Sequence, residues 1–204
     1  CCPGFSELKT DPANPKRMYA LGPGSETRAY AVNTATTGIY RCDDITVVSP
    51  CNWKLISNDT LTTSKPFDAL VIDPLNSNIV YSLGTKGVYY TLNAQAATVS
   101  WQTLLHSDTR IKVGSDNAAG VAIVENGKSV LYVGCRSCGI VRSGGLDPVT
   151  LKRESFTNFN DVQFQDPAKH THDLKKLKVR GVDYDPVTNR LFASTQGNGS
   201  FQLQ

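Results

Sequence analysis

The chain has 204 residues, of which 40% are hydrophobic and 19% charged, and its formal net charge is +3. This size allows a well-buried core, and the composition is that of an ordinary globular protein. No apolar run is as long as a membrane-spanning helix, and the small, evenly spread charge argues against nucleic-acid binding. We therefore expect no membrane span and no nucleic-acid partner.

A weak repeat occurs four times, and each copy has the pattern of three successive short strands. The first strand ends in an acidic residue, and an aromatic residue follows seven or eight positions later, inside the second strand. The third strand opens on glycine, at Gly38, Gly87, Gly139 and Gly199. The acid and aromatic pairs are Asp11 with Tyr19, Asp73 with Tyr81, Glu125 with Tyr132, and Asp185 with Phe192. A period of roughly 50 residues built from short strands predicts a β-propeller or a similar array.

The repeats cover residues 5–57, 67–105, 119–156 and 179–204. A fourth strand is expected at Trp53–Ile56, at Trp101–Leu105 and at Leu151–Phe156, whereas the last repeat ends at Gln204 inside its third strand. Four antiparallel strands make one propeller blade. We therefore predict a single all-β domain over residues 1–204, a β-propeller of about four antiparallel blades. It is either a four-bladed ring or an incomplete part of a larger one.

The aromatic residues of the repeat are expected to lie between blades as core. Trp53 and Trp101 can belong to the same core or stack on a sugar at the rim of a blade. The insertion between Gly22 and Thr37 interrupts the first repeat and contains Arg28 and Tyr30. Because loops carry function more often than regular elements do, both tryptophans and these two residues are candidate ligand-binding residues.

The second repeat resembles a blade of the Asp-box propellers, the group with sialidase-type, xyloglucanase-type and sortilin-type repeats. The resemblance lies in Phe67–Pro74, Asn78–Ser82, Gly87–Tyr90 and Trp101, and the strand skeleton extends to all four repeats. The hallmark Ser/Thr-x-Asp-x-Gly-x-x-Trp is intact in none of them, so the repeats are degenerate. The resemblance implies a propeller fold, and the known members have six or more blades.

A glycosidase of the xyloglucanase type needs two carboxylates that face one cleft. The acidic candidates are Asp43, Asp44, Asp68, Asp161, Asp173 and Asp183. None lies in a distinctive pattern, and each is expected to cap a turn or to face solvent. The resemblance would also allow a sialidase, but the diagnostic arginine motif of that group is absent. We predict no catalytic residues and no cofactor.

Six cysteines form an even set with two close pairs, Cys42 with Cys51 and Cys135 with Cys138. Structural disulfides are expected in both pairs, which indicates an oxidising compartment. The second pair could instead be a redox or metal motif. Cys1 and Cys2 have no local partner, so they can bond each other, a distant part of the fold or another chain.

Two glycosylation sequons, at Asn58 and Asn198, also favour secretion. The chain opens without methionine and without a visible signal peptide, so we expect a mature or trimmed form of a secreted, extracellular protein. His170, His172 and Asp173 form the one metal-like cluster, since residues two apart in a strand face the same side, but the favoured interpretation of this segment is a polar surface loop.

Two functions follow from these patterns. The first is a non-catalytic secreted propeller that acts as a binding or assembly module, with other protein chains or copies of itself as partners. The alternative is a carbohydrate-binding lectin or a degenerate relative of the glycoside hydrolases, with glycans as partners.

Overall fold

The computed structural model of the chain describes residues 5–22, 38–46, 52–57, 67–84, 87–103, 119–135, 139–147, 149–151, 160–161, 164–165, 171–172, 178–196 and 199–203. Every regular element in these segments is a β-strand, which confirms the predicted all-β class. No helix in the same segments qualifies as a membrane span.

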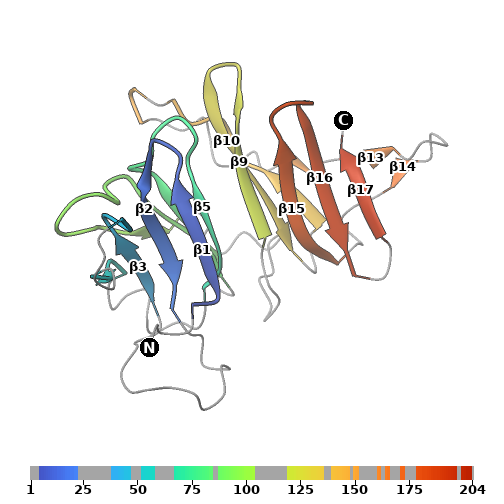
Figure 1. Cartoon of the computed structure of the whole chain (residues 1–204). Coiled ribbons are helices and arrows are strands. Elements are labelled where there is room, and N and C mark those ends of the chain that lie inside the picture. The colour runs from blue at the N-terminus through green and yellow to red at the C-terminus, as the bar shows by residue number, and fades with distance from the viewer. Residues whose placement is uncertain are drawn as a thin grey trace, which may run out of the picture. The chain divides into compact units, whose positions relative to one another are not determined.

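The first two sheets each contain four strands that follow one another in chain order (Figure 1). The first sheet consists of β1 (Glu7–Asp11), β2 (Asn14–Leu21), β3 (Ile39–Cys42) and β4 (Lys54–Leu55). The second consists of β5 (Phe67–Ile72), β6 (Val80–Gly84), β7 (Gly87–Thr91) and β8 (Gln102–Thr103). All neighbouring strands are antiparallel, so each sheet is a meander, as predicted for a propeller blade.

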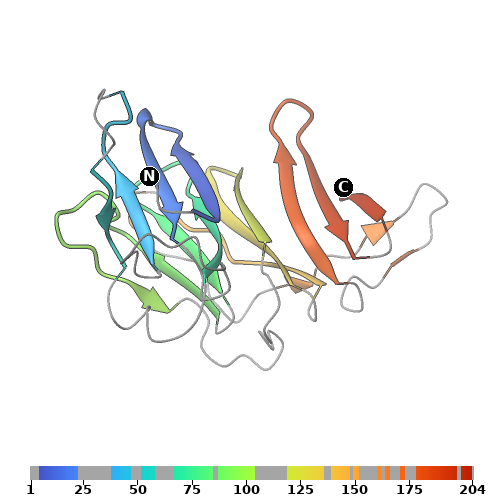
Figure 2. The ribbon, with the colours of Figure 1, turned by 60° about the horizontal axis from the view of Figure 1, so that its bottom comes forward.

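The third and fourth sheets repeat this order, and Figure 2 shows the fourth as a red antiparallel meander. The third sheet consists of β9 (Ala119–Glu125), β10 (Lys128–Cys135), β11 (Gly139–Arg142) and β12 (Asn160–Asp161). The fourth consists of β15 (Val179–Asp185), β16 (Arg190–Thr195) and β17 (Gly199–Leu203). A separate hairpin, β13 (Phe164–Gln165) and β14 (Thr171–His172), places β13 beside β17.

The fourth strand of the third blade differs from the prediction. The expected segment was Leu151–Phe156, but the strand that pairs with β11 is β12, at Asn160–Asp161. Leu151 itself lies in a left-handed conformation, with φ of 55°, after a turn that Asp147 caps. Such a conformation cannot continue a strand, and residues 152–156 lie outside the described segments.

Two compact units make up the chain, residues 1–105 and residues 106–204. In the first unit, β5 packs against β1 and β2. The buried core between these two sheets consists of Tyr19, Leu21, Ile39, Ile56, Leu70, Val80, Ala94 and Val99. A single domain over residues 1–204 stays a prediction.

The second unit repeats this packing, since β15 packs against β9 and β10. Its core consists of Ile123, Val130, Tyr132, Ile140, Val179, Val182, Leu191 and Ala193. Gly134 permits this close approach, because a Cβ atom there would lie 2.5 Å from Val179 Cγ1 and 2.7 Å from Val182 Cγ2. The interface between the third and fourth sheets therefore requires glycine at this position.

The acidic residues of the repeat close the turn between the first two strands of a blade. Asp11 accepts hydrogen bonds from the backbone N–H groups of Ala13 and Asn14, at 2.8 and 3.2 Å. Asp73 accepts the equivalent bonds in the second blade, at 2.9 and 3.1 Å. Both side chains are fully buried. Such a carboxylate satisfies backbone donors that the turn leaves unpaired, which gives the acidic half of the repeat a structural cause.

Candidate functional site

The two faces of the first sheet have different surroundings. Successive side chains in a strand point to opposite faces, so Tyr19 and Ile39 enter the core while their neighbours Ala20 and Tyr40 point away from it. Register places Leu8 opposite Ala20, Ala20 opposite Tyr40, and Tyr40 opposite Leu55. One row of side chains therefore crosses all four strands on the face that points away from the second sheet.

Aromatic rings gather at one end of this row. The ring of Phe5 lies 5.8 Å from that of Tyr40 and 4.7 Å from that of Trp53, centroid to centroid, with tilted planes. All three rings are half-buried, while Leu8 and Leu55 are 50% and 44% exposed. We call Phe5, Leu8, Tyr40, Trp53 and Leu55 the aromatic face.

The aromatic face has the residue types of an interaction surface. Exposed large apolar side chains that lie together mark interaction surfaces, and tyrosine and tryptophan are enriched in protein interfaces. Burial raises the pKa of Tyr40, so its phenol stays neutral at physiological pH. The face therefore offers rings and aliphatic groups without a charged side chain among them.

The two tryptophans lie in different surroundings, although the sequence placed them in equivalent repeat positions. Trp53 belongs to the aromatic face. Trp101 packs against the core of the first unit, and its indole N–H donates to the carbonyl of Ile56 at 2.8 Å. Trp101 thus joins the second sheet to the end of the first.

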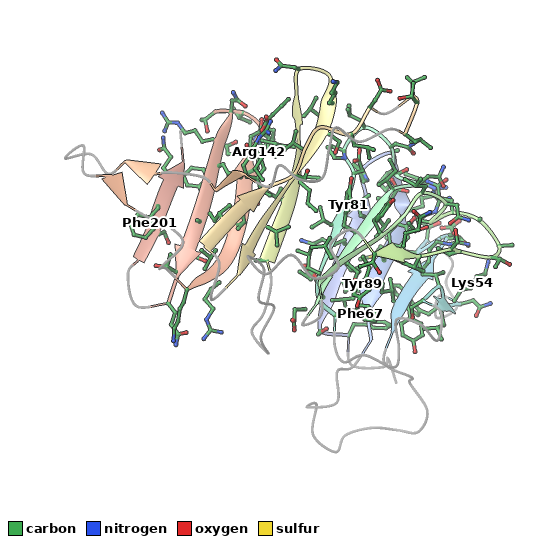
Figure 3. The ribbon with its side chains drawn as sticks, turned by 180° about the vertical axis from the view of Figure 1, so that it is seen from behind. Lys54, Phe67, Tyr81, Tyr89, Arg142 and Phe201 are labelled. Carbon is green, nitrogen blue, oxygen red and sulfur yellow. The ribbon has the colours of Figure 1, made fainter. Side chains whose placement is uncertain are left out.

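Charged groups occupy the other face of the first sheet, around Asp43. Lys54 Nζ lies 3.0 Å from this carboxylate and Arg17 Nε lies 3.3 Å from it; Figure 3 labels Lys54 on the outer strand. Arg41, 4% exposed, donates to Asp43 at 3.2 Å and to the carbonyls of Ala94 and Ala96. Burial alone would raise the pKa of Asp43, but hydrogen bonds from Lys54 and Arg41 outweigh it and lower that pKa. The cluster fixes the first sheet to the β7–β8 connection.

A second network joins three strands of the third sheet. Tyr132 Oη donates to Glu125 Oε1 at 2.6 Å, and Arg142, labelled in Figure 3, binds the other oxygen, Oε2, through Nε at 3.2 Å and through Nη2. Burial would raise the pKa of Glu125, yet the bonds from Arg142 and Tyr132 lower it. Burial and the Glu125 carboxylate raise the pKa of Tyr132 to about 12. An ionised acid beside a neutral phenol holds strands together but is poorly placed to transfer a proton at neutral pH.

Sequence reasoning found the spacing of this acid and aromatic pair but missed the arginine. In the first blade Arg41 stands opposite Tyr19, and in the third Arg142 stands opposite Tyr132. The signal was available, because both arginines lie three residues after the glycine that precedes or opens the third strand.

The other acidic candidates are spread over the fold. Asp44 caps its own turn, and its pKa is lowered by hydrogen bonds from the side chain and backbone of Thr46. Asp183 is exposed on β15 and accepts from the N–H of Tyr184 at 2.9 Å, and Asp68 is half-buried on β5. Of Asp161 only the backbone is described. Among the described side chains, these carboxylates do not gather around one cleft.

Several predicted site residues lie outside the described segments: Cys1, Cys2, Arg28, Tyr30, Cys51, Asn58, Cys138, His170, Asp173 and Asn198. Only the backbone of Cys135 and His172 is described. Cys42 is buried at the end of β3 and is disulfide-bonded. In the described part of the chain, no three His, Cys, Asp or Glu side chains gather as a metal site.

No family model and no curated protein matches the chain. Among the solved structures that resemble it is a gluconolactonase from Xanthomonas campestris, with a TM-score of 0.54 and 11% identity over 92% of this chain and 52% of that protein. A GH74 xyloglucanase from the same organism gives a TM-score of 0.54 and 14% identity over 98% of this chain and 29% of the enzyme.

The chain thus spans about half of the gluconolactonase and under a third of the xyloglucanase. Likeness at such low identity carries the fold and nothing of the activity. Together with the four meander sheets, it establishes an all-β, propeller-type fold of about four antiparallel blades.

Proposed function

We propose that this protein is a non-catalytic, secreted β-propeller module that binds other protein chains through the aromatic face of its first sheet. The observation that carries the proposal is the exposure of Leu8 and Leu55 on the face where the ring of Phe5 contacts those of Tyr40 and Trp53. Burying an exposed leucine against a partner is worth about 1–2 kcal/mol, and aromatic anchors add to this. The face therefore has the composition of an interface core.

The state of the acidic groups supports a module without catalysis. Asp43 and Glu125 are held ionised by arginines, and Asp11 and Asp73 are occupied as turn caps. A glycosidase acid needs a carboxyl group whose pKa is raised so that it stays protonated. The described acids with shifted pKa values all shift in the opposite direction.

Secretion is supported by the disulfide at Cys42, because structural disulfides persist in oxidising compartments. The sequons at Asn58 and Asn198 fit the same route. Kinship with Asp-box propellers belongs to the proposal as well, supported by the fold likeness to a xyloglucanase.

The test places a photo-crosslinking amino acid at Leu55, on the aromatic face, and at Val187, which is 91% exposed in the β15–β16 turn. Both proteins are irradiated in purified form and in the extracellular fluid of the source organism. We expect one recurrent protein adduct, identified by mass spectrometry, from position 55 and none from position 187. A hydrolysis screen on polysaccharides and lactones runs in parallel.

Two results would contradict the proposal. Adducts of equal pattern from both positions would mean that the aromatic face has no binding preference. Turnover of a sugar or lactone by the purified chain would mean that the protein is an enzyme.

A second candidate function is carbohydrate binding, which the half-buried Trp53 indole and the fold likeness to a xyloglucanase favour. The chain has two tryptophans, so Trp101→Phe leaves Trp53 as the sole indole. Titration of this variant with xyloglucan oligosaccharides should then change its fluorescence, and Trp53→Phe should abolish the change. Unaltered emission at saturating sugar would eliminate this candidate.

A further inference from the structure

The chain contains two examples of how one blade packs on the next. In the first unit, one face of the first sheet, with Tyr19 and Ile39, meets Leu70 and Val80 of the second. In the second unit, the third sheet meets the fourth in the same way. Within each unit, the blade that comes first in the chain therefore contributes a forward face, and the blade that follows contributes a back face.

The aromatic face is the back face of the first blade. Counting from the turn acids Asp11 and Asp73, Leu8 stands at the position of Leu70. Leu70 is fully buried against the first sheet, whereas Leu8 is 50% exposed. A position that is core in one blade is thus surface in another.

The fourth sheet also exposes a position that is core in other blades. The repeat aromatic is on the forward face, and Tyr19, Tyr81 and Tyr132 are 0%, 0% and 9% exposed. Phe192 occupies the same repeat position and is 37% exposed. It stands on the face opposite the buried Leu191, between Asp183 and Gln202 on the neighbouring strands.

We infer that the partner of the aromatic face is a second copy of this chain, which contributes the forward face of β15–β17 with Phe192. This inference rests on the proposed function and names the partner. The two surfaces are the repeat equivalents of faces that pack together twice within the chain. The contact is head to tail, because each copy uses a different surface, and such contacts form rings or open chains.

The test measures molar mass by light scattering across a wide range of protein concentrations. The variants are Leu8→Asp and Phe192→Asp, with Val187→Asp as the matched control, since Val187 is exposed and apolar but lies at a turn. Circular dichroism checks that each variant is folded. We expect the wild type and Val187→Asp to self-associate. Each of the other two variants should self-associate at least about thirtyfold more weakly than the wild type, as after loss of an interface hot spot.

Mixing the two defective variants gives the decisive result. Leu8→Asp retains an intact Phe192 surface, and Phe192→Asp retains an intact aromatic face, so a head-to-tail contact forms between them. The inference is supported if neither variant associates by itself and the mixture of the two does.

A wild type that is monomeric at every concentration would overturn the inference, as would a mixture that fails to associate. If Leu8→Asp abolishes association while Phe192→Asp does not, the aromatic face binds a different surface. The inference then falls and the proposed function stands. The proposed function is contradicted by a separate experiment, if crosslinking shows no preference for position 55.

Discussion

Tyr132 and Glu125 form a hydrogen bond of 2.6 Å between neighbouring strands of the third sheet, and Arg142 completes the set on the third strand. Tyr132 is 9% exposed. Its repeat counterpart Tyr81 donates to Asp73 at 3.3 Å. The acid and aromatic residues that define the repeat are therefore hydrogen-bonded partners in two blades.

This pair predicts a loss of stability at alkaline pH. The pKa of Tyr132 rises from 10.0 to about 12 on folding, so its contribution is complete below pH 10 and is lost as the pH rises through 12. The rise corresponds to roughly 2–3 kcal/mol. The free energy of unfolding, measured in urea, should fall over this range by more in the wild type than in Tyr132→Phe, which has no phenol to ionise. If the stability of both proteins falls in parallel with pH, ionisation of Tyr132 does not cause the alkaline loss.

Glu125 predicts a loss of stability at acidic pH. Its folded pKa lies below the ordinary value of 4.5, so it stabilises the fold above that value, and the contribution is lost as the pH falls through the folded pKa. Glu125→Gln should therefore flatten the acid limb of the unfolding profile. The double variant with Tyr132→Phe serves as the control. A coupling energy of zero between the two sites would contradict a shared hydrogen bond.

Arg41 should be far more important for stability than the other cations around Asp43. Its substitution by methionine leaves the carbonyls of Ala94 and Ala96 without their guanidinium donor, which should cost about 2–4 kcal/mol. Lys54→Met removes an ion pair whose lysine is 56% exposed, and should cost at most about 0.5 kcal/mol. Urea midpoints measure both, and equal losses would refute the distinction.

Gly134→Ala tests the packing between the third and fourth sheets. The new methyl group would lie 2.5 Å from Val179 Cγ1, and such overpacking costs about 1–3 kcal/mol. Val179→Ala removes the nearer of the two clashing atoms and leaves Val182 Cγ2, so the double variant should be less destabilised than the sum of the single ones. Simple additivity in thermal or urea unfolding would show that Gly134 does not contact Val179.

The disulfide of Cys42 predicts one peptide pair. Proteolysis without reductant, followed by mass spectrometry, should recover Cys42 linked to Cys51, because the β3–β4 connection joins them over nine residues. Cys42 linked instead to Cys1 or Cys2 would replace the expected local staple by a long-range one.

The strands of the repeat were predictable because each carries its own local signal. An apolar run ends in an acid, and a third run opens on glycine, whose φ is 69° at Gly139 and 79° at Gly199, values that favour this residue. The fourth strand of the third blade lacked such a signal, since Asn160 and Asp161 are polar residues that follow a long connection. A strand defined only by its partner cannot be recognised from its own residues.

The candidate site was predictable only in part. Trp53 was a candidate from its residue type, but Phe5, Leu8 and Leu55 were ordinary positions of a repeat. Their exposure depends on whether another sheet covers them, which is a property of tertiary packing. Residue type also gave no reason to separate Trp53 from Trp101, whose role follows from a carbonyl 45 positions away in the chain.

Each blade is a meander whose strands follow one another without interruption by any other blade. The hydrogen-bonded ladders of one blade therefore close within one continuous stretch of the chain. A tandem duplication of such a stretch adds a whole sheet and cuts no existing ladder. The number of blades in this architecture can consequently change by whole units through a single genetic event.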